Sequence, residues 1–312
     1  MPFAPSEPEE ILPFAGLVHR SGAHRLWQGQ APANDPHQTF TFAAASGFRV
    51  PVGIGVALMP FRHPYDAALQ AANLAQTMGR PVTVGYGPGA ADLQRGLLGA
   101  PYARPLAAAR EYLTVMRGLL EKGSADHVGE YYTCRAHLWQ IPRPPVEIGL
   151  GVLRPRMARL AGEVADVAIT WLTPASYLRS VVIPQLRAGA EAAGRPVPRL
   201  VAMVPLALAG PGRDGAEFAL ESNEGHMRLP HYADMLRRSG IDLDMTAPRR
   251  SAEAVIAGGA FVYGELERVV AELRAFEEAG VDDVVLNVTG VWMKDGAQGA
   301  LAELETVLGA LG

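Results

Sequence analysis

The stretch PVEIGLGVLRPRMARLAGEVADVAITWL, residues 145–172, holds a strand, a helix and a second strand in succession. An apolar run at 145–151 ends in glycine, Pro155 then begins a segment with helical spacing of apolar residues, and a second apolar run occupies 166–172. Both runs are continuously apolar, which is typical of strands covered on both faces. The stretch therefore predicts a βαβ unit and a parallel sheet.

The same pattern recurs along the chain. The apolar runs are residues 24–30, 50–58, 81–87, 145–151, 166–172, 199–208 and 282–288. Helices are expected at 105–122, 155–165 and 264–279, with a shorter one at 11–18 that Pro13 interrupts. These strands predict either a doubly wound sheet or a TIM (β/α)8 barrel whose first strand, in Met1–Ala4, is short or missing.

Residues 209–263 form a long span that precedes the last strand and lacks a clear strand of its own. It is too long for a bare connection, and barrel enzymes carry such elaborated loops at the carboxyl mouth. We expect a single barrel domain over 1–312, with 209–263 as a lid-like insertion. The alternative is a peripheral decoration that serves contacts between the copies of a homodimer.

Charge and cysteine content exclude several classes of protein. The chain has 28 basic and 32 acidic residues, a formal charge of −4, so it lacks the basic field that nucleic acids and anionic membranes attract. No apolar run approaches the roughly 18 residues of a membrane span, and MPFAPSEPEE is unlike a signal peptide. The single cysteine, Cys134, excludes an intramolecular disulfide. A cytoplasmic globular enzyme is predicted.

Glycine-rich strand ends are the first candidates for a binding site. They contain Gly85, Gly87 and Gly89, then Gly149 and Gly151 followed by Val152, Leu153 and Arg154, and finally Gly55, Val56 and Ala57. Glycine lets backbone N–H groups approach a phosphate, and a helix start adds positive charge. The other interpretation is that these glycines only form tight turns or pack closely inside a barrel.

Histidine, glutamine and aromatic residues supply the other candidates. His226 and His231 do not share a helix face across Pro230, so no metal site is predicted. His63, at a strand end, is the better acid–base candidate, although a histidine before proline is often only a turn residue. The residues expected to reach the barrel mouth from two strands are Trp27, Gln28, Gln30, Thr170 and Trp171, although tryptophan there is more often core.

Several of these segments together resemble the luciferase-like monooxygenase superfamily, especially its deazaflavin (coenzyme F420) branch. They are HRLWQGQ, VGIGVALMPFRHPYDAALQAANL, GRPVTVGYGPG, the 145–172 stretch and YGELERVVAELRAFEEAGVDDVVLNV. The resemblance implies a (β/α)8 barrel that holds the ring of F420, or alternatively FMN, at its carboxyl mouth. It also implies a bulge, often with a non-proline cis peptide, at Gly55–Val56 or Val56–Ala57.

The resemblance further assigns roles to residues. Gly85, Gly87 and Gly89 would line the cofactor, while Gly149, Gly151, Val152 and Arg154 would receive its phosphate. The family often has an Asp–His pair closing the second strand, but this chain has Gln30–Ala31 there. Proton donation would then fall to His63, to Tyr65, to a residue of 209–263 such as His226, or to water.

The activity that the resemblance implies is reduction of an activated C=C or C=N bond by hydride from reduced F420. RLWQGQ and FRHPYDAALQA are similar to actinobacterial members that tailor natural products, and dehydroalanine in a lanthipeptide precursor is one substrate of such enzymes. The substrate is thus expected to be a small molecule or a peptide. One alternative is an FMN-dependent monooxygenase that uses O2, and a second is a non-catalytic flavin-binding paralogue.

Overall fold

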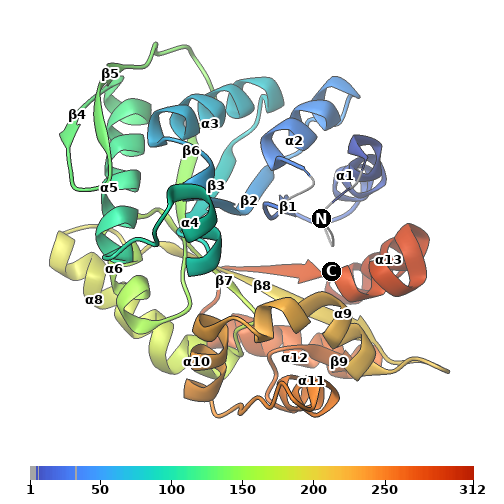
Figure 1. The fold of residues 1–312 in the computed structure, drawn as a ribbon. Coiled ribbons are helices and arrows are strands. Elements are labelled where there is room, and N and C mark those ends of the chain that lie inside the picture. Colours follow the sequence, from blue (N-terminus) through green and yellow to red (C-terminus); the bar gives the residue numbers. More distant parts are fainter. Residues whose placement is uncertain (1–4, 6, 32–33) are drawn as a thin grey trace.

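The computed structural model describes residues 5, 7–31 and 34–312, and a sheet of eight strands lies at the centre of these residues (Figure 1). Its order is β1 (Leu26–Gln28), β2 (Val52–Leu58), β3 (Val82–Gly87), β6 (Val146–Gly151), β7 (Val167–Trp171), β8 (Arg199–Leu208) and β10 (Asp283–Asn287), with β9 (Val262–Gly264) beside β8. All neighbours are parallel.

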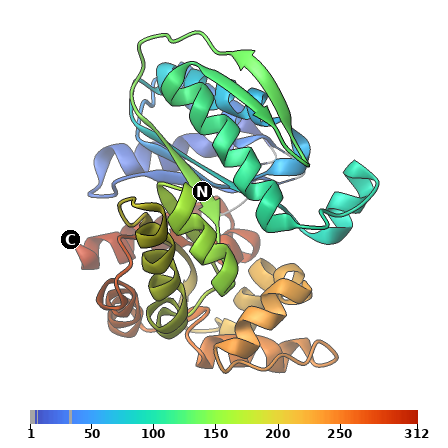
Figure 2. The ribbon, with the colours of Figure 1, turned by 90° about the vertical axis from the view of Figure 1, so that its left-hand side faces the viewer.

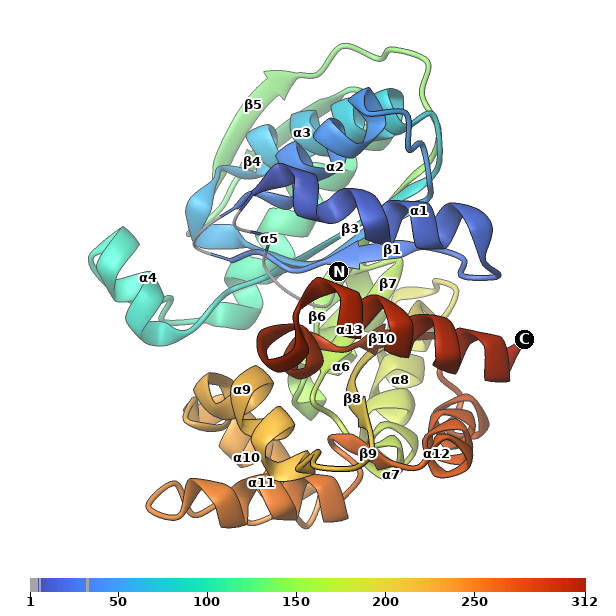
Figure 3. The same ribbon diagram turned by 90° about the vertical axis from the view of Figure 1, so that its right-hand side faces the viewer.

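The seven predicted strands are confirmed, and their spatial order follows the chain. A doubly wound sheet would reverse its order at one point, so the nearly closed barrel is the correct alternative. The expected first strand, Met1–Ala4, lies outside the described residues. At the two ends of the strand order, helix α1 (Leu12–Arg20) contacts α13 (Thr289–Leu311), and Arg20 pairs with Glu305 at 2.5 Å (Figure 3).

Helices surround the barrel and bury an apolar core between themselves and the strands. They are α2 (Pro36–Ala45), α3 (Pro64–Met78), α4 (Ala91–Leu98), α5 (Pro105–Arg117), α6 (Pro155–Val164), α7 (Ala175–Tyr177), α8 (Ile183–Ala193) and α12 (Leu266–Ala279). Shorter turns are η1 (Pro8–Ile11), η2 (Met59–Phe61), η3 (Gly118–Lys122) and η4 (Leu178–Val182). The three predicted long helices are confirmed. Pro13 does not interrupt α1, because it lies in the first turn, where its missing N–H needs no partner.

A hairpin interrupts the barrel pattern between η3 and β6. It consists of β4 (Ser124–Val128) and β5 (Thr133–His137), which pair antiparallel and pack beside α5 (Figure 2). The sequence did not predict it, because its residues alternate in burial and form no continuous apolar run.

The insertion that follows β8 is helical, but the expectation that 209–263 holds no strand is wrong, because Val262–Gly264 at its end forms β9 beside β8. It contains α9 (Gly215–Met227), α10 (Pro230–Arg238) and α11 (Pro248–Ala257), between β8 and β9. These helices and α4 project from the same side of the barrel (Figures 2 and 3). Among the described residues, no helix is both long and apolar enough to cross a membrane.

Candidate active site at the carboxyl end of the barrel

Bulky side chains fill the barrel interior, and they fit there only because the neighbouring strands carry glycine beside them. The interior cluster is Trp27, Val167, Ile169, Val201 and Met203. A Cβ on Gly85 would lie 2.3 Å from Cδ1 of Ile169, and one on Gly55 would lie 2.6 Å from Cε of Met203. These distances are far too short for any side chain. Trp27 likewise belongs to this core rather than to a cofactor wall.

Three of the predicted cofactor-lining glycines therefore serve interior packing. Gly149 joins Gly85 and Gly55 in this role, because a Cβ there would lie 3.0 Å from Ile169 and 3.1 Å from Cα of Gly85. The interpretation of these glycines as close-packing positions is the one that the structure supports. Gly89 lies beyond β3 with φ of 73°, in the turn before α4.

The end of β2 carries the expected bulge. The Gly55–Val56 peptide is cis, at the first of the two anticipated positions, and the pairing of β2 with β3 shifts register between Ile54 and Ala57. A Cβ on Gly87 would lie 3.1 Å from Cγ2 of Val56, and one on Gly151 would lie 3.4 Å from its Cγ1. The side chain of Val56 thus lies beside two strand ends that carry no side chains themselves.

Val56 and the adjacent glycine ends of β3 and β6 form the floor of the mouth. A series of aromatic rings connects this floor to the insertion. Val56 and Trp171 both pack against the interior cluster, and the ring centroids of Trp171 and His226 are 5.6 Å apart. The ring of Tyr232 lies 5.1 Å from His226 and 4.8 Å from His231. Helix α9 therefore reaches the carboxyl end of β7, and α10 packs against α9 there, so the insertion lies beside this part of the mouth.

The electrostatics of this cluster favour neutral side chains. Burial, with a smaller effect of His231, lowers the pKa of His226 to about 4, so its imidazole is neutral at pH 7. Burial also raises the pKa of Tyr232 well above its usual value, so the phenol stays protonated. The buried Nε1 of Trp171 has no hydrogen-bond partner among the described residues. A ligand with an acceptor atom would satisfy it.

Contacts within the protein engage most of the residues that were predicted to bind a phosphate. The N–H of Val152 donates to the carbonyl of Ile169 at 2.8 Å, so it is not available to a phosphate. The side chain of Val152 is buried in the main core, and Leu153 packs against that core. Arg154 precedes α6, is half exposed, and lies 3.7 Å from Asp234 of α10. Of the four residues from Gly151 to Arg154, only Arg154 offers a charged side chain to an anion.

Three further predicted ring contacts belong to the outer core. Ala57 is fully buried among the helices and strands. Thr170 alternates with the inward-facing Ile169 and Trp171, and its hydroxyl donates to the carbonyl of Val201 at 3.4 Å. The amide of Gln28 donates to Thr39 of α2 at 3.5 Å. Their side chains are therefore not placed to touch a ring at the mouth.

His63 and Tyr65 make contacts with the hairpin instead of with the aromatic cluster. Nδ1 of His63 accepts the N–H of Tyr65 and so caps α3, while its Nε2 lies 3.2 Å from the carbonyl oxygen of Thr133. The hydroxyl of Tyr65 donates to the carbonyl of His137 at 3.1 Å. Both residues hold the hairpin against α3, and the structure does not bring them to Trp171 and His226.

A polar network that the sequence reasoning missed lies beside β1. Asp35 caps α2 by accepting the N–H of His37 at 2.9 Å, and it also lies 2.9 Å from Nδ1 of His37. Arg62 forms an ion pair with Asp35 and lies 3.3 Å from Oε1 of Gln30. An Asp–His pair is therefore present near Gln30, but on α2 rather than at the strand end. The only sequence signal was an aspartate before Pro36, which is typical of a helix start.

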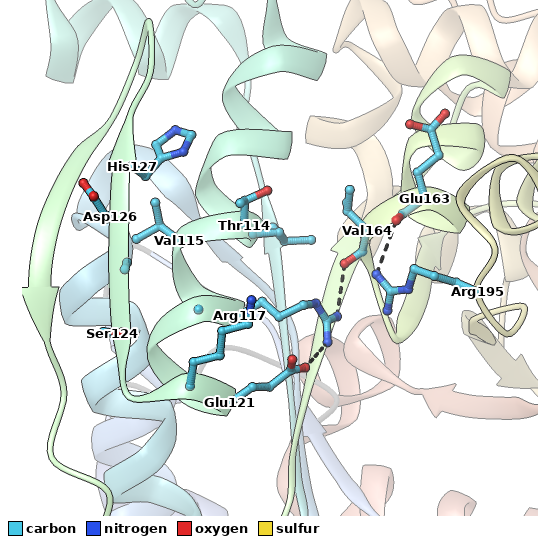
Figure 4. A pocket seen from close by; sticks show the side chains of 14 residues that line it. Thr114, Val115, Arg117, Glu121, Ser124, Asp126, His127, Glu163, Val164 and Arg195 are labelled. Carbon is cyan, nitrogen blue, oxygen red and sulfur yellow. Dashed lines mark hydrogen bonds and ion pairs between the residues drawn. The ribbon is translucent and has the colours of Figure 1, made fainter.

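A cavity of about 520 Å³ lies elsewhere, between α5, β4 and the end of α6 (Figure 4). Its guanidinium groups are engaged within the protein, because Arg117 bonds Glu121 and the carbonyl of Val164, and Arg195 bonds the carbonyl of Glu163. The cavity is remote from the carboxyl strand ends. Within residues 5, 7–31 and 34–312, no three His, Cys, Asp or Glu side chains gather as metal ligands would.

Comparison with known proteins defines the class of the chain. A family model described as luciferase-like monooxygenase matches residues 2–283. The chain belongs to this family and is an enzyme of an oxidoreductase class. The fold is shared with an F420-dependent tetrahydromethanopterin reductase from Methanopyrus kandleri (TM-score 0.71, 20% identity, 95% and 94% of the two chains covered). It is also shared with an F420-dependent secondary alcohol dehydrogenase in complex with an F420–acetone adduct (0.74, 21%, 96% and 95%).

Relatives in sequence carry similar names. The 5,10-methylenetetrahydromethanopterin reductase of Methanopyrus kandleri is 26% identical over 313 residues, covering 93% of this chain and 87% of the relative. The corresponding enzyme of Methanolobus tindarius is 28% identical over 62% of this chain. An F420-dependent glucose-6-phosphate dehydrogenase of Nakamurella multipartita is 31% identical over 54% of it. The last two alignments span only 59% and 50% of those relatives.

Proposed function

We propose that the chain is an F420-dependent reductase that transfers hydride from the reduced deazaflavin to an activated C=C or C=N bond. The observation that carries the proposal is the floor formed by Val56 beside the bare ends of β3 and β6. A Cβ on Gly151 meets only Val56 and a carbonyl of Tyr86, at 3.4 to 3.7 Å. A planar ring can therefore approach the backbone there. The F420-dependent names of the relatives support the choice of ring.

The residues at the mouth fit a deazaflavin in both shape and polarity. Val56 and Trp171 supply apolar surface, and the unpaired Nε1 of Trp171 supplies a donor. Arg154, before α6, can contact a phosphate of the side chain, and the start of α6 adds a positive dipole end. When bound, reduced F420 supplies a hydride and does not activate O2.

His226 is the polar residue that we assign to the substrate side. The neutral imidazole of His226 can donate an N–H to the carbonyl or imine acceptor that activates the substrate double bond, and so polarise that bond. Trp171 and Tyr232 hold the imidazole between them. Helices α9 and α10 then act as the lid that keeps water from the hydride. His63 and Tyr65 have no catalytic part in this proposal.

The direct experiment is titration of the purified protein with F420 and, separately, with FMN. We expect F420 to bind at least about tenfold more tightly, a difference of about 1.4 kcal/mol in binding free energy. Oxidation of reduced F420 by conjugated carbonyl compounds, imines and a dehydroalanine peptide should then be followed anaerobically. Tighter FMN binding with O2-dependent turnover would favour the monooxygenase. Binding without turnover of any substrate would favour the non-catalytic paralogue.

The narrower substrate stays open within this class. A dehydroalanine residue of a lanthipeptide precursor is one activated C=C bond, and it is included in the experiment as one substrate among several. The relatives named above lend it no support. The homodimer also stays a prediction, which sedimentation of the purified chain would test.

A further inference from the structure

The side chain of Arg62 lies at the centre of the polar network beside β1. Its exposed fraction is 8%, and it follows η2 directly. It forms an ion pair with Asp35, donates to Oε1 of Gln70, and lies 3.2 Å from Nδ1 of His37 and 3.3 Å from Oε1 of Gln30. One guanidinium group therefore links α2, α3 and the end of β1.

The partners of Arg62 are themselves held in place. Burial alone would raise the pKa of Asp35, but hydrogen bonds from His37 and Arg62 outweigh it and keep this pKa well below its usual range. The ion pair is therefore present at neutral pH. Burial lowers the pKa of His37, so its imidazole is neutral. The amide of Gln70 donates to Asp66 at 2.9 Å, so its oxygen is the atom turned toward Arg62.

Gln30 is fixed at both its backbone and its side chain. Its backbone N–H donates to the carbonyl of Val56 at 3.1 Å, which ties it to the bulge of β2. Its Oε1 accepts from Arg62, and an amide places its nitrogen opposite its oxygen. The half-buried Nε2 has no partner among the described residues. The amide thus keeps two N–H donors without a partner among the described residues, in a residue whose backbone is tied to Val56.

We propose that Arg62 is a positioning residue that orients the Gln30 amide, so that its N–H group donates to a carbonyl oxygen or ring nitrogen of the bound cofactor. This inference rests on the proposed binding of a deazaflavin or flavin ring at the same mouth. Because the charges of Asp35 and Arg62 cancel, this ion pair orients the Gln30 amide without adding net charge beside it. Arginine suits this task because Nη2 contacts both Asp35 and Gln30 while Nη1 contacts Gln70, and a single lysine ammonium cannot cover these two separate positions.

Three variants test the inference through cofactor affinity. Gln30→Glu keeps the acceptor for Arg62 but removes the donor, and we expect it to weaken F420 binding by about tenfold. Arg62→Lys keeps the charge beside Asp35 but loses the fork, and we expect a comparable loss. Gln70→Met is the matched control, because it removes another amide contact of Arg62 without touching Gln30. Its affinity should equal that of the wild type.

Two further measurements separate positioning from a general structural role. In a Gln30→Leu background, Arg62→Lys should weaken binding no further, because Arg62 acts through Gln30. In the cofactor-free full chain, NMR relaxation should show that the side-chain amide of Gln30 is rigid. In Arg62→Lys the same amide should become mobile. Thermal melts of each variant report whether it is folded.

The outcomes are distinct. If the wild type binds neither F420 nor FMN, the proposed function and this inference both fail. If the wild type binds either ring and Gln30→Glu or Arg62→Lys binds it equally well, only the inference is overturned. An undiminished effect of Arg62→Lys in the Gln30→Leu background would also overturn it.

Discussion

The rings of Trp171 and His226 lie 5.6 Å apart, and this contact joins the last residue of β7 to helix α9 of the insertion. It brings a residue from the 209–263 segment to the side of the mouth where Val56 forms the floor. The insertion is therefore placed to contribute polar groups to the site as well as to cover it.

His226→Phe separates the packing role of His226 from its hydrogen-bonding role. The phenyl ring keeps contact with Trp171 and Tyr232 but has no N–H group. We expect turnover to fall by roughly a hundredfold, because an oriented donor is lost in a water-poor site, while F420 affinity changes little. Steady-state kinetics and a cofactor titration measure the two effects. Wild-type turnover in His226→Phe would show that His226 only packs.

The stability of the fold should decline as the pH falls from 6.5 to about 4. The folded pKa of His226 is about 4, below the ordinary 6.5, so the unfolded chain binds more protons in this window. Each proton of difference changes the free energy of unfolding by up to about 1.4 kcal/mol per pH unit. Urea unfolding across this range measures the slope. His226→Gln should make the slope shallower, and an unchanged slope would contradict the lowered pKa.

Two glycine substitutions should have opposite consequences. Gly85→Ala would place a methyl group 2.3 Å from Cδ1 of Ile169 and 2.8 Å from the carbonyl oxygen of Ile54. We therefore expect the free energy of unfolding to fall by roughly 1–3 kcal/mol. Gly151→Ala meets only ordinary contacts at 3.4 Å or more. It should leave the melting temperature nearly unchanged but weaken cofactor binding, because the methyl group occupies space beside Val56. Normal cofactor affinity in Gly151→Ala would contradict the position assigned to the ring.

The residues at the amino end of the barrel should contribute to stability but not to catalysis. Glu147 accepts from Thr83 at 2.6 Å and pairs with Arg199 at 2.8 Å and Arg25 at 3.2 Å. Burial would raise the pKa of Glu147, but hydrogen bonds from Thr83 and Arg199 lower it overall. We expect Glu147→Gln to cost about 1–2 kcal/mol of stability, since it leaves the partly buried Arg25 without its carboxylate, while Arg199 keeps Asp283. Its kcat and KM should match the wild type, because the site lies at the opposite end.

Local features of the sequence were enough to predict the parallel βαβ units, while the resemblance to the luciferase-like family implied the barrel over the doubly wound sheet. Continuous apolar runs, helical periodicity, Pro155 as the first residue of α6 and Gly280 after α12 all act within a few residues, so their consequences can be read without tertiary contacts. The β4–β5 hairpin was missed because its residues alternate in burial and form no continuous apolar run. The insertion was located by its length, but the bounds of its three helices and the strand β9 at its end were not predicted.

The sequence by itself determined the order of the strands and helices and the residues from which a mouth is built, and its resemblance to the family implied the bulge in β2. Only the tertiary structure decided which of them face it. Gly85 and Gly151 are alike in sequence, yet Ile169 from a distant strand fills the space beside one and leaves the other free. His63 contacts the hairpin, while Asp35 and His37 at the start of α2 meet Arg62 at the end of η2. Such outcomes depend on contacts between residues far apart in the chain, which no local pattern encodes.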